Sequence, residues 1–223
     1  MLDLVLPQRC LVCGAGGAQL CTACAFELPA LRSPLCDQCG APTAWPVQRC
    51  VECSGRRLGF ATARAAVAYD GAVRLVVAAW KERGLRRLAA AAAAVVAERV
   101  PRPQADLLTF VPADVDRHRR RGHHPAALLA KALAERWQLP CEPLLARAQR
   151  SGRQRGLSLV ERRRNVAGAF RAEGGLDGCV LLVDDVYTSG ATASAAASAL
   201  RVAGAPRVDV VTFARAVRMS GVR

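Results

Sequence analysis

Short apolar runs alternate with amphipathic stretches along most of the chain beyond residue 59. Runs of consecutive branched apolar residues predict strands that are buried on both faces, as a parallel sheet requires. The strongest run covers 179–183, and runs at 107–111 and 207–214 predict two further strands. Residues 60–69 alternate as a half-buried extended segment does, and 140–146 are predicted to form a short strand.

Helices are predicted between these strands from apolar spacing and from residues that begin or end helices. The first follows Asp70, a residue type that caps helix N-termini, and runs to about residue 82. Others are predicted at 86–99, 125–137 and 192–203. Strands that alternate with helices indicate an α/β fold in which a parallel sheet is flanked by helices.

The residues after the 179–183 strand bring two kinds of binding chemistry together. The pair Asp184 and Asp185 comes first, and a loop of small, mostly hydroxylated residues at 188–192 leads into a helix. Adjacent carboxylates suit a sugar diol or the hydration shell of magnesium. Amides and hydroxyls at a helix N-terminus, beyond the carboxyl end of a strand, suit a phosphate. A ribose with a 5′-phosphate satisfies both halves, whereas the aspartate pair alone would favour an ordinary solvated turn.

Composition limits the class of protein. A chain of 223 residues accommodates one large domain, or a medium domain with a small appendage. Hydrophobic residues make up 52% of the chain, but no apolar run reaches the ~18 residues of a membrane span. The first residues lack the pattern of a secretory signal, so we expect a cytoplasmic protein. No Walker-type loop and no G-x-G-x-x-G after a strand occur, which disfavours nucleotide hydrolysis and dinucleotide binding.

The chain is strongly basic, with a formal net charge of +14. All but two of its 32 basic residues are arginines, the exceptions being Lys81 and Lys131, and a GC-rich genome is the simplest cause of that bias. The densest basic segment is 147–171, where eight arginines accompany the single acid Glu161. Such a segment repels itself unless it is solvated or faces an anion, such as pyrophosphate or a nucleic-acid backbone.

Eight of the ten cysteines form four C-x-x-C pairs. Each pair grips one side of a tetrahedral metal, and four thiolates close its shell, so two structural zinc sites are predicted. Disulfides are the alternative, which a cytosolic chain disfavours. Pairing in sequence order and crossed pairing, first pair with third, both remain open. The predicted ligands are Cys10, Cys13, Cys21, Cys24, Cys36, Cys39, Cys50 and Cys53.

These cysteines predict a small zinc module at 1–59, followed by a larger α/β domain at 60–223. The module's core would be small, so metal binding would supply most of its folding free energy. Cys141 and Cys179 are left over, and each is predicted to be a small buried hydrophobic side chain beside a strand.

The run 180–192 resembles the phosphoribosyl-pyrophosphate-binding motif of the type I phosphoribosyltransferases. The resemblance implies that Asp184 and Asp185 hold the ribose 2′- and 3′-hydroxyls and that 188–192 cradle the 5′-phosphate. It also implies that magnesium accompanies phosphoribosyl pyrophosphate in the site. The residues it assigns to binding are Asp184, Asp185, Tyr187, Thr188, Ser189, Gly190, Ala191 and Thr192. No catalytic residue is assigned.

From Cys10 to Arg215 the chain resembles the competence protein F (ComF) family, phosphoribosyltransferase-like proteins with an N-terminal double zinc ribbon. Besides the cysteines and the 180–192 run, the resemblance is carried by Tyr69-Asp70-Gly71, Trp80-Lys81, Val111-Pro112, Arg119-Arg120-Arg121-Gly122, Gly156-Leu157-Ser158, Glu161-Arg162-Arg163-Arg164-Asn165 and Gly168-Ala169-Phe170. It implies a pyrophosphate loop made of Val111, Pro112, Ala113 and Asp114. It also implies a basic loop with Arg120, Arg121, Arg162, Arg163 and Arg164. One departure is His123-His124-Pro125, where family members commonly carry Phe-Asn-Gln.

The resemblance implies a cytoplasmic role in natural transformation, linked to single-stranded DNA that enters the cell. Three hypotheses follow: binding of single-stranded DNA on a basic face, docking of a competence helicase by the zinc module, and an active phosphoribosyltransferase in nucleobase salvage. An aromatic content of 4% leaves little to stack a base, so contact with DNA would be chiefly electrostatic. We favour the first two hypotheses over a dedicated metabolic enzyme.

Overall fold

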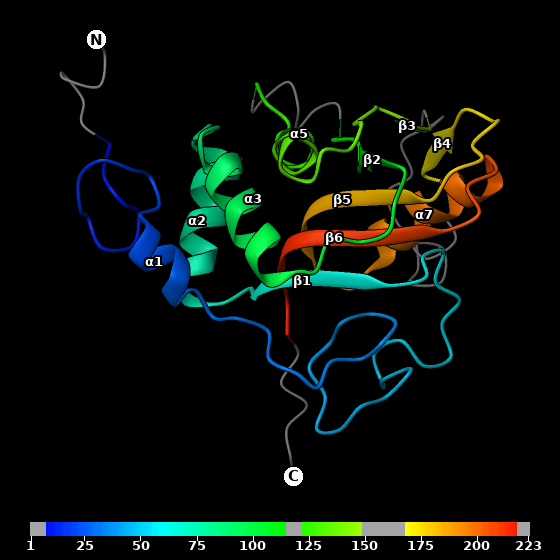
Figure 1. The fold of residues 1–223 in the computed structure, drawn as a ribbon, viewed down its shortest axis with the longest axis horizontal. Coiled ribbons are helices and arrows are strands. Elements are labelled where there is room, and N and C mark those ends of the chain that lie inside the picture. The colour runs from blue at the N-terminus through cyan, green and yellow to red at the C-terminus, as the bar shows by residue number, and fades with distance from the viewer. Residues whose placement is uncertain (1–7, 115–121, 149–167, 218–223) are drawn as a thin grey trace, which may run out of the picture.

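The computed structural model describes residues 8–114, 122–148 and 168–217. Its centre is a parallel sheet with the strand order β1-β6-β5-β2 (Figure 1). The strands in this order are β1 (Ala63–Ala68), β6 (Val208–Arg215), β5 (Val180–Tyr187) and β2 (Leu107–Phe110). Every residue of β6 is buried, because this strand lies inside the sheet and both of its faces are covered.

Helices cover both faces of this sheet (Figure 1). They are α2 (Gly71–Glu82), α3 (Leu88–Arg99) and α5 (Pro125–Trp137) on one face, and α7 (Ala191–Val202) on the other. Along β5, Leu181 and Val183 pack in the core with α2, α3 and α5, whereas Val180 and Leu182 pack in the core with α7. The predicted parallel sheet flanked by helices is confirmed. Within the described residues no helix combines the length and apolarity needed to cross a bilayer.

Local signals in the sequence set where two of these helices begin and end. The Asp70 carboxylate accepts a hydrogen bond from the Gly71 N–H at 2.7 Å, so it caps α2 as predicted. α5 begins at Pro125, at a position where a helix needs no N–H donor. It ends before Gln138, which adopts the left-handed conformation with φ +52°. Both helices match the ranges that the sequence predicted.

The strand β5 is longer than its apolar run predicted. It continues through both aspartates to Tyr187, because β6 pairs with it over the same length, including Asp184 with Thr212. The polar side chains of the aspartates do not end the strand, because the backbone of β6 continues to pair with the backbone of β5. Asp184 and Asp185 therefore lie in the last part of a strand, not in the turn that follows.

Residues 140–146 do not form one continuous strand as predicted, although Leu145 and Ala146 do lie in a strand. β3 (Leu145–Arg147) pairs antiparallel with β4 (Phe170–Ala172) in a separate two-stranded ribbon, and Cys141 alone bridges to β2. Pro140 and Pro143 lack the N–H groups that a continuous ladder requires, which explains the interruption.

The cysteine pairs gather into two groups on opposite faces of the sheet. The first cysteine group consists of Cys10, Cys13, Cys21 and Cys24. Its segment includes α1 (Thr22–Glu27), and it packs with α2 and α3. The second cysteine group (Cys36, Cys39, Cys50 and Cys53) packs in the core with α7. In Figure 1 the first group lies in the dark blue chain beside α2 and α3, and the second in the lighter blue chain below β1. The domain boundary at residue 59 stays a prediction.

Candidate ligand site and metal groups

A cavity of about 300 Å³ lies where β2 and β5 end, at the carboxyl edge of the parallel sheet. Its lining joins three predicted regions: the aspartate pair, the loop that enters α7 and the segment that follows β2. The predicted residues in this lining are Val111, Pro112, Ala113, Asp114, Asp184, Asp185, Thr188 and Thr192. Tyr187 and Gly190 line a smaller adjoining hollow, and Ser189 and Ala191 are in neither lining.

The two aspartates lie beside a lysine from α2. The Asp185 Oδ1 is 2.6 Å from the Lys81 Nζ, and the Asp185 side chain is 13% exposed. The Asp184 Oδ1 accepts a hydrogen bond from the Asp185 N–H at 2.9 Å. Burial and the neighbouring Asp185 charge raise the pKa of Asp184 to about 7, despite the opposing effect of Lys81 and Arg147. A bound cation, or hydroxyl groups that donate to this carboxyl, would favour its charged form.

The loop at 188–192 depends on one glycine. Gly190 has φ +72°, and a Cβ at this position would overlap the hydroxyl oxygen of the buried Tyr187. Only glycine therefore allows the loop to fold against the tyrosine ring. α7 begins at the next residue, so the positive end of its dipole adjoins the loop, as an anion site requires.

Arg147, the first residue of the basic stretch, supports the segment that follows β2. Its Nε donates to the Pro112 carbonyl oxygen at 3.0 Å, and its guanidinium lies 5.0 Å from the centre of the Phe170 ring. Arg147 also lines the cavity, as does Lys81, so two cationic side chains from different elements face the same space. The predicted basic-loop residues Arg120, Arg121, Arg162, Arg163 and Arg164 lie outside the described residues.

The adjacent histidines His123 and His124 have different partners. The His123 Nε2 is 2.7 Å from the Trp80 carbonyl oxygen and its ring is buried. The His124 Nε2 is 2.9 Å from the Val111 carbonyl oxygen, and its ring meets the Phe110 ring edge to face. His124 reaches the cavity lining, whereas His123 is held against α2.

The geometry of both cysteine groups fits a tetrahedral metal. Within each group all ligand atoms lie within 4.8 Å of one another, so the pairs combine in sequence order and crossed pairing is excluded. The Cys39 and Cys50 sulfurs are 3.5 Å apart, and the Cys13 and Cys21 sulfurs are 3.7 Å apart. Zinc–sulfur bonds of ~2.3 Å in a tetrahedron place sulfurs about 3.8 Å apart, far from the ~2.05 Å of a disulfide.

Comparison with known proteins places this arrangement in a family. Residues 1–54 match the family described as the double zinc ribbon domain, which supports zinc as the metal of the two groups. The chain is 30% identical to the DNA utilization protein YhgH of Salmonella typhi over 95% of its length and 99% of that protein. Competence protein F of Haemophilus influenzae is 28% identical over 88% of the chain and 90% of that protein. The chain belongs to the ComF family.

Solved structures similar to this ComF-family chain include a glutamine phosphoribosylpyrophosphate amidotransferase of B. subtilis, complexed with ADP and GMP. It shares 26% identity with a TM-score of 0.38, over 57% of this chain and 25% of that chain. A structure described as the allosteric regulatory enzyme of purine biosynthesis shares 24% identity with a TM-score of 0.39, over the same fractions of 57% and 25%. The ComF-family chain thus spans a quarter of each of these structures.

Sequence reasoning missed several residues that line the cavity of this ComF-family chain: Tyr69, Lys81, His124 and Arg147. Lys81 stands out by residue type, because it is one of two lysines in a chain whose other basic residues are arginines. Nothing local in the sequence links it to Asp185, since the two residues come from elements that only the tertiary fold brings together.

Proposed function

We propose that this chain binds phosphoribosyl pyrophosphate, or a similar ribose phosphate, with magnesium in the carboxyl-edge cavity, and that it acts in DNA uptake or utilization. One observation carries the ligand proposal: a single cavity joins a carboxylate pair, a loop at a helix N-terminus and the segment 111–114. A ribose with phosphate and pyrophosphate groups needs three such regions. The names of the relatives, competence protein F and DNA utilization protein, support the biological role.

In this proposal each region holds one part of the ligand. Asp184 and Asp185 accept hydrogen bonds from the ribose hydroxyls, and backbone N–H groups of 188–192 donate to the 5′-phosphate. The segment 111–114 contacts the pyrophosphate, whose charge Lys81 and Arg147 offset. Magnesium, when bound, would neutralise further charge on the pyrophosphate, its hydration shell held by the aspartates.

Calorimetric titration with phosphoribosyl pyrophosphate and magnesium tests the ligand proposal. Asp185→Asn should weaken binding by about tenfold or more, because a hydrogen bond to a charged acceptor and the partner of Lys81 are lost. Asp177→Asn is the matched control, since Asp177 is exposed and outside the cavity lining, and its affinity should equal that of the wild type. Equal binding by all three proteins, or binding by none, contradicts the proposal. Release of pyrophosphate in the presence of a nucleobase would show that the protein also catalyses phosphoribosyl transfer.

Two adjoining basic grooves support contact with single-stranded DNA. They have volumes of about 400 and 510 Å³ and meet at Thr62, just before β1 begins. The arginines in their linings are Arg64, Arg102 and Arg207 in the first, and Arg49, Arg56 and Arg57 in the second. The first groove lies at the amino edge of the sheet, away from the carboxyl-edge cavity, so DNA in this groove would not overlap a ligand in the cavity. Docking of a helicase stays a prediction.

The DNA proposal is tested by the salt dependence of oligonucleotide affinity. Each lost phosphate contact should flatten the slope of log K against log salt by about 0.7. Arg57→Ala and Arg102→Ala should each produce that change, whereas Arg136→Ala, which lies on α5 and lines neither groove, should not. A slope altered by Arg162→Ala but by neither groove variant would instead place the DNA on the basic loop.

A further inference from the structure

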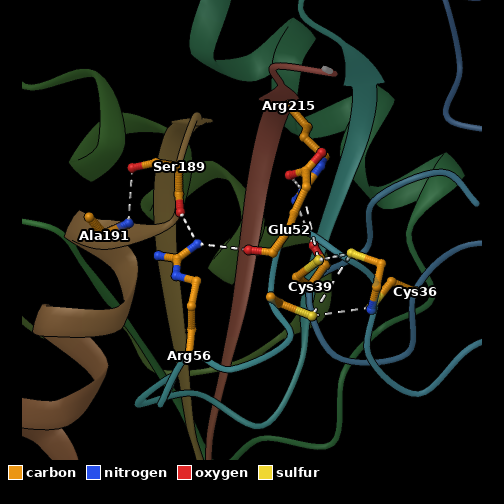
Figure 2. Close-up of polar contacts among 9 residues, drawn as sticks. Cys36, Cys39, Glu52, Arg56, Ser189, Ala191 and Arg215 are labelled. Carbon is orange, nitrogen blue, oxygen red and sulfur yellow. Dashed lines mark hydrogen bonds and ion pairs between the residues drawn. The ribbon is translucent and has the colours of Figure 1, made fainter. Parts of the chain in front are cut away.

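Two arginines connect the second cysteine group to the loop at 188–192. Figure 2 shows Arg56, which follows the last cysteine of the group, reaching across to Ser189. The Arg56 Nη1 donates to the Ser189 carbonyl oxygen at 2.8 Å and to the Glu52 carbonyl oxygen at 3.3 Å. One guanidinium thus joins the backbone of the loop to the backbone of the cysteine group.

Arg215, at the end of β6, forms the second connection. Its guanidinium is 2% exposed, donates to the Cys39 carbonyl oxygen at 2.6 Å and to the Glu52 carboxylate at 2.8 Å (Figure 2). The same guanidinium lies 4.4 Å from the centre of the Tyr187 ring. Because Tyr187 in turn packs against Gly190, Arg215 supports the loop from its other end.

Glu52 belongs to both connections and lies between Cys50 and Cys53 in the sequence. Its carbonyl oxygen accepts from Arg56 and its carboxylate from Arg215. A metal that holds the flanking thiolates together would therefore restrain the position of this residue. The first cysteine group has no such contact with the loop in the described part of the chain, since it packs on the other face of the sheet.

We propose that Arg56 and Arg215 are positioning residues through which the second cysteine group holds the 188–192 loop in its anion-binding shape. Metal loading of that group then sets the affinity for the 5′-phosphate, and the first cysteine group does not. This proposal rests on the proposed ribose-phosphate site. Its physical basis is preorganisation: N–H groups already held in place bind an anion without the entropic penalty of ordering a free loop.

The test compares two ligands on Arg56→Ala, with inorganic pyrophosphate and ribose 5-phosphate as probes, each with magnesium. Affinity for ribose 5-phosphate should fall about tenfold, because one charged hydrogen bond that shapes the loop is lost. Affinity for pyrophosphate should stay unchanged, since the segment 111–114 is untouched. Arg56→Lys, which keeps a cationic donor, should restore most of the lost affinity. A purely structural role for Arg56 would weaken both ligands together or neither.

Arg9→Ala is the matched control, because the Arg9 Nη1 donates to the Gly14 carbonyl oxygen at 3.2 Å within the first cysteine group. It should leave both affinities unchanged. If wild type and Asp185→Asn bind ribose 5-phosphate equally, the proposed site itself fails. If wild type binds, Asp185→Asn does not, and Arg56→Ala binds as well as wild type, the site stands and the positioning proposal fails. Zinc content of two ions per chain in Arg56→Ala confirms that the cysteine groups are intact.

Discussion

The two cysteine groups share a motif but differ in everything around it. In the first, Cys13 is exposed and Cys21 and Cys24 are half-buried, and the group attaches to the outside of α2 and α3. In the second, Cys36, Cys39 and Cys53 are at most 2% exposed and lie in the core that includes α7. The spacing of the thiols decides only that each group can hold a metal. What the group supports is decided by the segments packed against it.

Removing one ligand from each group is the strongest way to break this comparison. Cys39→Ser should release one metal and destabilise the protein by roughly 5 kcal/mol or more, because metal binding contributes to folding. Cys13→Ser should also release one metal, but with a smaller effect, because Cys13 is exposed whereas Cys39 is buried. Zinc analysis with thermal unfolding measures both effects. Equal destabilisation by the two variants would show that the groups are equivalent.

The arginines that connect each group to the sheet give a second pair. Arg215→Ala should cost about 3–5 kcal/mol, because it leaves the Glu52 carboxylate without its buried partner. Arg99 connects the first group to α3 by donating to the carbonyl oxygens of Ala25, Phe26 and Leu28. Because these contacts are partly exposed, Arg99→Ala should cost only about 1–2 kcal/mol in free energy of unfolding, measured with urea. The reverse order of the two costs would contradict the comparison.

The glycine that follows the first C-x-x-C pair of each group gives a further comparison, with a smaller expected effect. Gly14 and Gly40 each follow a C-x-x-C pair with φ of +76° and +68°, and each N–H donates to the first cysteine's carbonyl oxygen at 2.9 Å. A Cβ at Gly14 would meet open space, whereas one at Gly40 would overlap the Ala63 carbonyl oxygen at the start of β1. Gly14→Ala should therefore cost about 1 kcal/mol from backbone strain alone. Gly40→Ala should cost about 1–3 kcal/mol more, a difference that paired melting curves would detect.

The last prediction concerns pH at the proposed ligand site. Asp184 keeps its proton up to about pH 7 in the folded protein, against 3.8 for an ordinary aspartate. The free energy of unfolding should therefore fall as pH rises from about 4 to 7, because the unfolded state binds fewer protons. Affinity for the magnesium–ribose phosphate should rise instead, by about tenfold between pH 6 and 8, as the carboxyl ionises.

Asp184→Asn is the control for both pH effects, since the amide keeps the Oδ1 that accepts from the Asp185 N–H. It should abolish the fall in stability and leave weak ligand binding with little dependence on pH. If the affinity of the wild type for the ligand does not change between pH 6 and 8, Asp184 has the pKa of an ordinary aspartate and the prediction is wrong. Calorimetry and urea unfolding at matched pH values provide the two measurements.

Much of the fold follows from signals local to the sequence. The apolar positions of 125–137 repeat at helical spacing and predict α5, and Asp70 predicts the start of α2. The cysteine ligands and the aspartate pair were also readable, since neighbours in sequence supply their chemistry. The end of β5 was not, because its continuation to Tyr187 depends on pairing with β6 and on nothing in its own side chains.

The contacts that complete the candidate site escaped prediction for a common reason. Lys81 meets Asp185, Arg56 meets Ser189 and Arg215 meets Glu52 only across long stretches of chain. Arginine is also so frequent here that no single one stands out by residue type. Of the two arginines of the basic stretch that the structure describes, Arg147 and Arg171, Arg147 lines the cavity.

The hydrogen bond from Arg215 to Cys39 joins residues 176 positions apart in the chain. Such a contact forms only after the intervening loop has closed, which makes it one of the slowest to establish during folding. A nascent chain that still lacks β6 would carry its thiols, its aspartates and its glycine loop, yet it would have no support behind Tyr187. The proposed ligand site is therefore complete only after β6 has entered the sheet between β1 and β5.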